Sequence, residues 1–268
     1  MQRCQRFAKE EDLVKYQCTI EEREEYEPHI ARGMVIYAGI DYEQILREAE
    51  KEADIILWDG GNNDWAFFKP DLYFTVVDPH RVGHETKFYP GEVNVKLADY
   101  LVINKEDSAP AGNVEQLVKN LSKIAPKVPV IHADSKLTVK DVAAIKGKRV
   151  LCVDDGPTIT HGYCSTGAAW FAAKSHGCTI VDPRPFVEGE IASAFEVYPH
   201  LDKVLPALGY GERQLADLEK TINGIDCDAV VIGTPIDLAR ILKITKPSVR
   251  VTYSFKESEG GKLTEMVQ

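Results

Sequence analysis

Short apolar runs alternate with amphipathic stretches along this chain, and the alternation constrains the fold more than any other feature. Runs without polar alternation are typical of strands buried on both faces of a sheet, and the stretches between them have helical spacing. We therefore expect an α/β fold with a parallel sheet. The predicted strands are 34–38, 54–59, 72–78, 100–104, 128–132, 149–154, 179–182, 229–234 and 249–253, and the predicted helices are 42–53, 114–124, 165–174 and 212–222.

Composition excludes several classes of protein. A net charge of −10 argues against a general nucleic-acid binder, because affinity for phosphate backbones comes from clustered Lys and Arg. Six cysteines without a Cys-x-x-Cys pair suggest neither a zinc site nor a disulfide framework. No apolar run approaches the ~18 residues of a membrane span, and the N-terminus lacks the apolar core of a signal peptide. We expect a reduced, cytoplasmic protein with no nucleic acid or membrane partner.

The run Asp54-Ile-Ile-Leu-Trp-Asp59-Gly60-Gly61 indicates a buried strand that delivers an acid into a glycine turn. A carboxylate at such a strand end can orient Mg²⁺, as the Walker B acid does in P-loop NTPases, so Asp59 is predicted as a catalytic and Mg²⁺-binding residue. Gly60 and Gly61 would let the backbone approach a phosphate, or would simply form a tight turn. Residues 62–64 could orient water or Mg²⁺, or cap the next segment.

A second predicted strand ends in Asn104-Lys105-Glu106-Asp107, which matches the Asn-Lys-x-Asp pattern of guanine-binding sites. There the Asp carboxylate accepts guanine N–H groups and the Lys lies across the purine. A phosphate loop of the form Gly-x-x-x-x-Gly-Lys-Ser/Thr does not occur in the sequence. The chain therefore shows the base and metal half of a nucleotide site, for ATP or GTP.

Three further groups of residues are candidates for handling phosphate. His80, Arg81, His84 and Lys87 follow the predicted strand at 72–78 and would suit a polyanion, although they could also be satisfied surface residues.

In the C-terminal part, Thr158, Thr160 and His161 precede a small-residue helix whose N-terminus could hold an anion, or Thr160 could only cap that helix. Arg184 lies on a proline-stiffened loop and could clamp a phosphate or pair with Asp182.

Near the N-terminus, Thr19 and Glu22 have the spacing of a capping box, which predicts a helix start. The acidic run 21–27 is then a solvated helical turn that ends near Pro28.

Several blocks along the chain carry a resemblance. They are Cys18-Thr-Ile-Glu-Glu-Arg-Glu-Glu-Tyr-Glu-Pro28, Trp58-Asp-Gly-Gly-Asn-Asn-Asp64, Val77-Asp-Pro-His-Arg-Val-Gly-His-Glu85, Gly156-Pro-Thr-Ile-Thr-His-Gly162 and Val181-Asp-Pro-Arg-Pro185. In these blocks the chain resembles the cyclic 2,3-diphosphoglycerate synthetase family and its bacterial, GTPase-like relatives. The resemblance spans nearly the whole chain and corresponds to the C-terminal portion of family members, which carry an N-terminal domain and a P-loop before it.

The resemblance implies an incomplete P-loop NTPase-like domain at 1–145 and a second, smaller α/β domain at 146–268 that covers the substrate. It implies an ATP- and Mg²⁺-dependent enzyme that closes 2,3-diphosphoglycerate into a cyclic phosphoanhydride. We expect the chain to be inactive without its P-loop region, which is missing or separate, and to form a homo-oligomer. A GTP-hydrolysing switch or delivery factor and a non-catalytic regulatory fragment are the alternatives.

Overall fold

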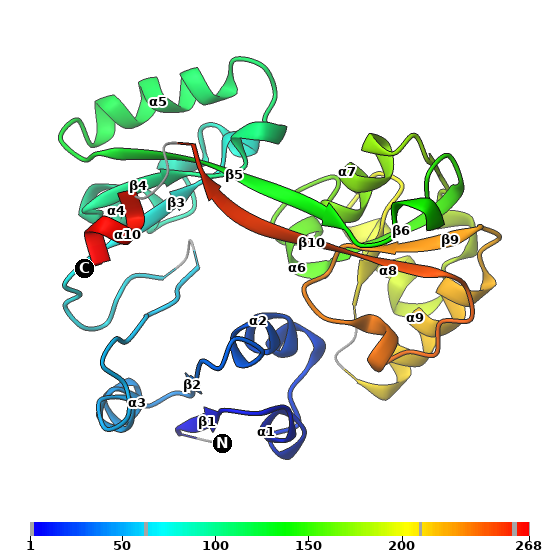
Figure 1. The fold of residues 1–268 in the computed structure, drawn as a ribbon, viewed down its shortest axis with the longest axis horizontal. Coiled ribbons are helices and arrows are strands. Elements are labelled where there is room, and N and C mark those ends of the chain that lie inside the picture. Colours follow the sequence, from blue (N-terminus) through cyan, green and yellow to red (C-terminus); the bar gives the residue numbers. More distant parts are fainter. Residues whose placement is uncertain (1–2, 62–63, 209–210, 259–261, 268) are drawn as a thin grey trace. The chain divides into compact units, whose positions relative to one another are not determined.

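The computed structural model describes residues 3–61, 64–208, 211–258 and 262–267 (Figure 1). It consists of two compact units, unit 1 (Met1–Glu48 and Leu137–Thr252) and unit 2 (Ala49–Lys136 and Tyr253–Gln268). The predicted α/β fold with a largely parallel sheet is confirmed. The units differ from the predicted division at residue 145, because each is built from two separate segments. None of the helices in the described ranges has both the length and the apolar character of a membrane span.

The sheet of unit 1 is built around β6 (Arg149–Asp155). On one side β6 pairs in parallel with β9 (Ala229–Ile232), which in turn pairs with β10 (Ser248–Glu257). On the other side the start of β6 pairs with β7 (Thr179–Ile180) and its end pairs with β8 (Leu205–Ala207). A strand with neighbours along both edges has its backbone hydrogen bonds satisfied, which makes β6 the centre of this sheet.

Helices cover both faces of β6. Leu151 and Val153 belong to the apolar cluster formed with α8 (Gly189–Val197) and α9 (Glu212–Gly224). The alternate residues Val150 and Cys152 belong instead to the cluster formed with α7 (Ala168–Ser175). Successive side chains of a strand point to opposite faces, so a strand covered on both faces must be apolar throughout. This explains the unbroken apolar run in the sequence.

The N-terminal segment of unit 1 adds α1 (Glu10–Lys15), α2 (Ile20–Ile30), α3 (Tyr42–Ala49) and a small sheet. The predicted strand at 34–38 forms as β2 (Ile36–Ala38), but it pairs antiparallel with β1 (Gln5–Phe7) outside the large sheet. The capping box predicted before α2 is present: the Thr19 N–H donates to Glu22 Oε2 at 2.7 Å, and the Glu22 N–H to Thr19 Oγ1 at 3.3 Å. The helix continues to Ile30 rather than ending at Pro28.

Unit 2 contains the parallel strands β3 (Phe74–Val77), β4 (Tyr100–Ile103) and the first part of β5 (Val130–Val139). The C-terminal part of β10 also belongs to this unit, next to β5. Helices α4 (Gly91–Leu97) and α5 (Asn113–Ile124) pack on one face through Val95, Leu117 and Leu121. The short helix α10 (Lys262–Val267) lies on the other face (Figure 1), where Leu263 and Met266 contact residues of β4 and β5.

The predicted strand at 54–59 is wrong. In the structure this segment has no regular secondary structure, and the side chains of Ile55 and Leu57 are 63% and 72% exposed. A strand needs a neighbour for its backbone N–H and C=O groups, and β3 pairs only with β4 among the described residues. The apolar run is therefore left unpaired. Asn62 and Asn63, which follow it, lie outside the described residues.

Replacing Gly233 by Ala should destabilise unit 1. A Cβ at this position would lie 2.5 Å from the Ala169 nitrogen and closer still to Asp154 Oδ1. We expect Gly233→Ala to lower the free energy of unfolding by about 1–3 kcal/mol, measured by chemical denaturation. Gly224→Ala is the matched control, because no atom lies within 4 Å of its Cβ position. Equal stability of the two variants would contradict the packing at the end of β9.

Candidate functional site

In unit 1 the end of β6 is anchored by a buried carboxylate. Asp154 is fully buried and accepts N–H groups from Ala169 at 2.7 Å, Gly167 at 3.1 Å and Trp170 at 3.4 Å, around the first turn of α7. Burial raises its pKa to about 6, although these hydrogen bonds work in the opposite direction. Asp154 therefore joins β6 to α7 and leaves the next residue, Asp155, at the sheet edge.

The residues after Asp155 are held by local hydrogen bonds. Asp155 accepts both the N–H and the hydroxyl of Thr158. The buried Thr160 hydroxyl donates to the Gly156 carbonyl at 2.7 Å, and His161 Nδ1 lies 3.1 Å from the Tyr198 hydroxyl. These contacts favour the alternative in which this segment is a structural connection from strand to helix. A role of Thr158, Thr160 and His161 in binding substrate stays a prediction.

A second buried carboxylate reaches the end of β9. The Glu24 side chain of α2 is 5% exposed, and Thr234 Oγ1 donates to its Oε1 at 2.7 Å. The expectation of a fully solvated turn at 21–27 is therefore wrong for Glu24, since packing of α2 against this strand end buries it. In the sequence, Glu24 was indicated only as one residue of the block 18–28 that carries the family resemblance. Carboxylates thus gather at the adjacent ends of β6 and β9.

Ligands of open α/β sheets bind outside the carboxyl ends of the strands, where connections diverge. The ends of β6 and β9 meet this description, because the next strand after β6 in the chain, β7, lies on the side of β6 away from β9. An edge that carries Asp155 and Glu24 favours a positively charged group over a phosphate.

Arg184 follows β7 and forms an ion pair with Asp182. Its Nε lies 2.8 Å from Asp182 Oδ1, and the side chain is exposed. Hydrogen bonds from this guanidinium hold the pKa of Asp182 below its usual value. The structure thus shows the pairing that the sequence left open, and binding of a phosphate by Arg184 stays a prediction.

The corresponding edge of unit 2 is organised by Asp78, which the sequence analysis did not single out. Asp78 Oδ2 lies 3.0 Å from the Arg81 guanidinium and 3.2 Å from Lys105 Nζ, and Asp78 caps the turn at His80. Burial alone would raise the pKa of Asp78, but Lys105, the His80 N–H and Arg81 together lower it. Lys105 has a left-handed backbone, with φ of 63°, and its ammonium is directed to Asp78.

The predicted basic cluster carries less positive charge than its composition suggests. Burial lowers the pKa of both His80 and His84, which favours the neutral form of each ring. Arg81 is balanced by Asp78, and Lys87 is exposed. His80 Nε2 lies 2.9 Å from Ser108 Oγ. Asp78 brings Arg81 and Lys105 together and offsets part of their positive charge.

Asp107, predicted to recognise guanine, contacts other residues of unit 2. Its carboxylate lies 3.2 Å from Lys136 Nζ and accepts the Ser135 N–H at 3.3 Å. The side-chain oxygen of Asn104 is buried without a hydrogen-bond partner, so an unsatisfied acceptor lies at the end of β4. Base recognition by Asn104, Lys105 and Asp107 stays a prediction, and it would require Asp107 to exchange its present contacts.

Asp59, Gly60 and Gly61 lie on the exposed segment that was predicted as a strand. Among the described residues no group of three or more His, Cys, Asp and Glu side chains has the arrangement of a metal site. Mg²⁺ is usually bound by one or two carboxylates held near phosphate oxygens. The backbone around Asp59 is irregular and exposed, and binding of Mg²⁺ by Asp59 stays a prediction.

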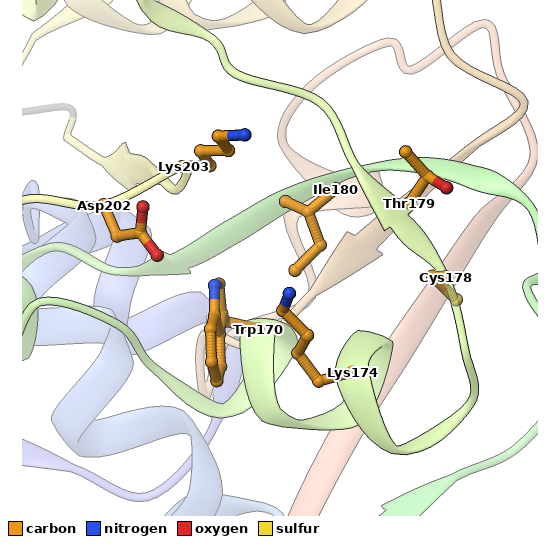
Figure 2. A pocket seen from close by; sticks show the side chains of 7 residues that line it. All are labelled: Trp170, Lys174, Cys178, Thr179, Ile180, Asp202 and Lys203. Atoms are coloured by element: carbon orange, nitrogen blue, oxygen red, sulfur yellow. The ribbon is translucent and has the colours of Figure 1, made fainter.

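Unit 1 also contains a hollow of about 440 Å³ that the sequence did not indicate (Figure 2). Its lining consists of Trp170, Lys174, Cys178, Thr179, Ile180, Asp202 and Lys203. Lys174 Nζ lies 5.2 Å from the Trp170 ring centre, a cation–π contact. Most of the lining comes from α7 and the start of β7, which pairs with the start of β6. The hollow is therefore not at the strand ends where ligands of this fold class bind.

These features define an α/β protein with charged side chains at the carboxyl ends of parallel strands. No family model matches the chain. It is 55% identical, over 98% of its own length, to arginine synthetase ArcE of Thermococcus kodakarensis, and spans 59% of that protein. It is 30% identical over 47% of its length to the cyclic 2,3-diphosphoglycerate synthetase of Thermococcus sibiricus, spanning 29% of it. It is 25% identical over 59% of its length to the cyclic 2,3-diphosphoglycerate synthetase of Rubrobacter xylanophilus, spanning 32% of that protein.

The chain is related to the cyclic 2,3-diphosphoglycerate synthetase family, which confirms the resemblance found in the sequence blocks. All three of these relatives are synthetases by name. The chain spans about three-fifths of the length of ArcE.

The buried Asp154 should make stability depend on pH. Its pKa is about 6 in the folded state and about 4 when unfolded, so the folded state binds the proton more tightly. The contribution of this group to stability is greatest below pH 4 and is lost as the pH rises to 6, by about 3 kcal/mol in total. Asp154→Asn removes the titration. The difference in unfolding free energy between wild type and variant should change over pH 4–6, and a constant difference would contradict the raised pKa.

Proposed function

We propose that this chain is part of a nucleotide-dependent synthetase whose product is arginine. The observation that carries the proposal is the 55% identity to arginine synthetase ArcE over 98% of the chain. The charge balance supports it, since a protein with a net charge of −10 attracts a cationic product more readily than a polyanion. The nucleotide, ATP or GTP with Mg²⁺, would supply the free energy of bond formation.

The proposed place for the guanidinium is the edge formed by the ends of β6 and β9. Carboxylates bind a guanidinium with paired, charge-assisted hydrogen bonds. Asp155 lies at this edge and is already oriented by Thr158, while Glu24 and Thr234 form the neighbouring wall at the end of β9. Asp154 would hold the edge in position without contacting the ligand, because its side chain is fully buried against α7.

L-Arginine binding to the purified chain tests this proposal. Calorimetry at low salt should give a saturable heat with L-arginine, and Asp155→Asn should weaken binding by about ten-fold or more, because a charged hydrogen bond contributes about 1.5–3 kcal/mol. Asn can still cap the turn after β6, so the fold should be retained. Asp237→Asn is the control, since Asp237 likewise caps a turn in unit 1. Absence of arginine binding would contradict a product site in this part of the enzyme.

Formation of cyclic 2,3-diphosphoglycerate is the second candidate, favoured by the similarity to two synthetases of that compound. In that case Arg81 and Lys87 of unit 2, with His80 and His84 donating once protonated, or Arg184 of unit 1 would bind a phosphate. Arg81→Ala or Arg184→Ala should then weaken binding of 2,3-diphosphoglycerate by roughly ten- to hundred-fold, with little change in melting temperature. Binding of 2,3-diphosphoglycerate but not arginine would favour this candidate.

The chain alone should not turn over ATP or GTP. Phosphoryl transfer depends on the loop and Lys that position the phosphates, and the sequence contains no Gly-x-x-x-x-Gly-Lys-Ser/Thr motif. We expect phosphate release with Mg²⁺ at the background rate in an enzyme-coupled assay. Turnover by the chain that is abolished in Asp59→Ala would contradict this expectation and would place a complete nucleotide site within these residues.

A further inference from the structure

The hollow in unit 1 is separate from the acidic strand-end edge, and one of its walls is formed by α7 (Figure 2). Its volume of about 440 Å³ lies within the usual range of small-molecule sites, about 300–1,000 Å³. Trp170 and Lys174 are four residues apart on α7 and therefore share one face of the helix. Ala169 and Ala173, which precede them, are fully buried in the core, so this wall is fixed to the sheet.

The other walls of the hollow come from β7 and from the segment before β8. Ile180 of β7 provides an apolar side chain, and Asp202 and Lys203 lie shortly before β8. The Asp202 N–H donates to the Ser165 carbonyl at 3.0 Å, and Val204 is fully buried. The backbone that carries the two charged residues is therefore held in a defined position.

The polar ends of these side chains face one space without pairing. In Figure 2 the Asp202 carboxylate, the Trp170 indole nitrogen and the ammonium groups of Lys174 and Lys203 border the hollow. Lys174 contacts the Trp170 ring, but among the residues that the structure describes none of the four polar groups has a hydrogen bond or an ion pair. Two cations, a carboxylate and an N–H donor therefore remain available to a ligand.

The charges of the lining define the class of ligand. Two ammonium groups and one carboxylate are matched by a molecule with two anionic groups and one cationic group, which is the charge pattern of an acidic α-amino acid such as glutamate or aspartate. The neighbouring Asp182 and Arg184 are paired with each other and add no net charge. A phosphate fits less well, because it would face the Asp202 carboxylate and because Lys174 lies in the last turn of α7, at the negative end of the helix dipole.

We propose that the hollow of unit 1 binds an acidic α-amino acid. Lys174, Lys203 and the Trp170 N–H hold its two carboxylates, Asp202 accepts its ammonium group, and its methylene groups lie against Ile180. Charge-assisted hydrogen bonds of this kind are roughly twice as strong as neutral ones. The site lies beside α7 and β7 rather than at the strand ends, so it does not depend on the arginine site or on the reaction that the synthetase catalyses.

Calorimetry of the full chain with L-glutamate and L-aspartate tests this site. At low salt at least one of them should give a saturable heat, and Lys174→Gln and Lys203→Gln should each weaken its binding by about ten-fold or more. Both lysines are exposed, so the variants should keep the melting temperature of the wild type. Lys220→Gln is the matched control, because it removes one exposed ammonium from α9, on the opposite face of the sheet, and should leave the affinity unchanged.

The ammonium group of the ligand is tested with glutarate and succinate, which keep the carboxylates of glutamate and aspartate but lack the amino group. Asp202→Asn should weaken binding of the amino acid by about ten-fold without weakening binding of the matching dicarboxylate. Absence of a saturable heat with both amino acids would overturn the proposal, as would binding that is indifferent to both lysine variants. Tighter binding of glutarate, succinate or inorganic phosphate than of the amino acids would also overturn it and would identify a site for simple anions.

Discussion

The arrangement of unit 1 depends on one buried carboxylate. Asp154 ends the central strand β6 and accepts three backbone N–H groups around the first turn of α7, so a single side chain joins the strand to the helix that covers it. Two glycines make this possible: a side chain at Gly167 or Gly233 would overlap Asp154. The position of Asp155, and with it the acidic edge where we place the ligand, follows from this contact.

The two units carry different electrostatic patterns at their strand ends. In unit 2 the charges cancel within the chain: Asp78 is surrounded by Arg81 and Lys105, and Asp107 by Lys136. In unit 1 the carboxylate of Asp155 accepts the N–H of Thr158, and the carboxylate of Glu24 accepts the Thr234 hydroxyl. Hydrogen bonds from neutral groups orient a carboxylate but leave its charge, which suits recognition of a cation.

The sequence predicted the elements whose local pattern and packing partners agree in the structure. The strand at 149–154 was predicted because its unbroken apolar run reflects cover on both faces, and the capping box before α2 is a local interaction. Residues 54–59 have the same pattern, but a strand also needs a paired neighbour, which composition does not reveal. The burial of Glu24 and the pairing of Lys105 with Asp78 depend on contacts between distant segments, and no local spacing encodes them.

The discontinuous construction of the units has a consequence for dissecting the protein. The chain passes between units at residues 48–49, 136–137 and 252–253, and the last two crossings occur inside the strands β5 and β10. A truncation therefore cannot isolate either unit, because a cut that frees one removes a strand from the other. Excision of residues 49–136 is the better tool: linking residue 48 to residue 137 and ending at residue 252 would give unit 1 a continuous chain that keeps β6 to β9 whole.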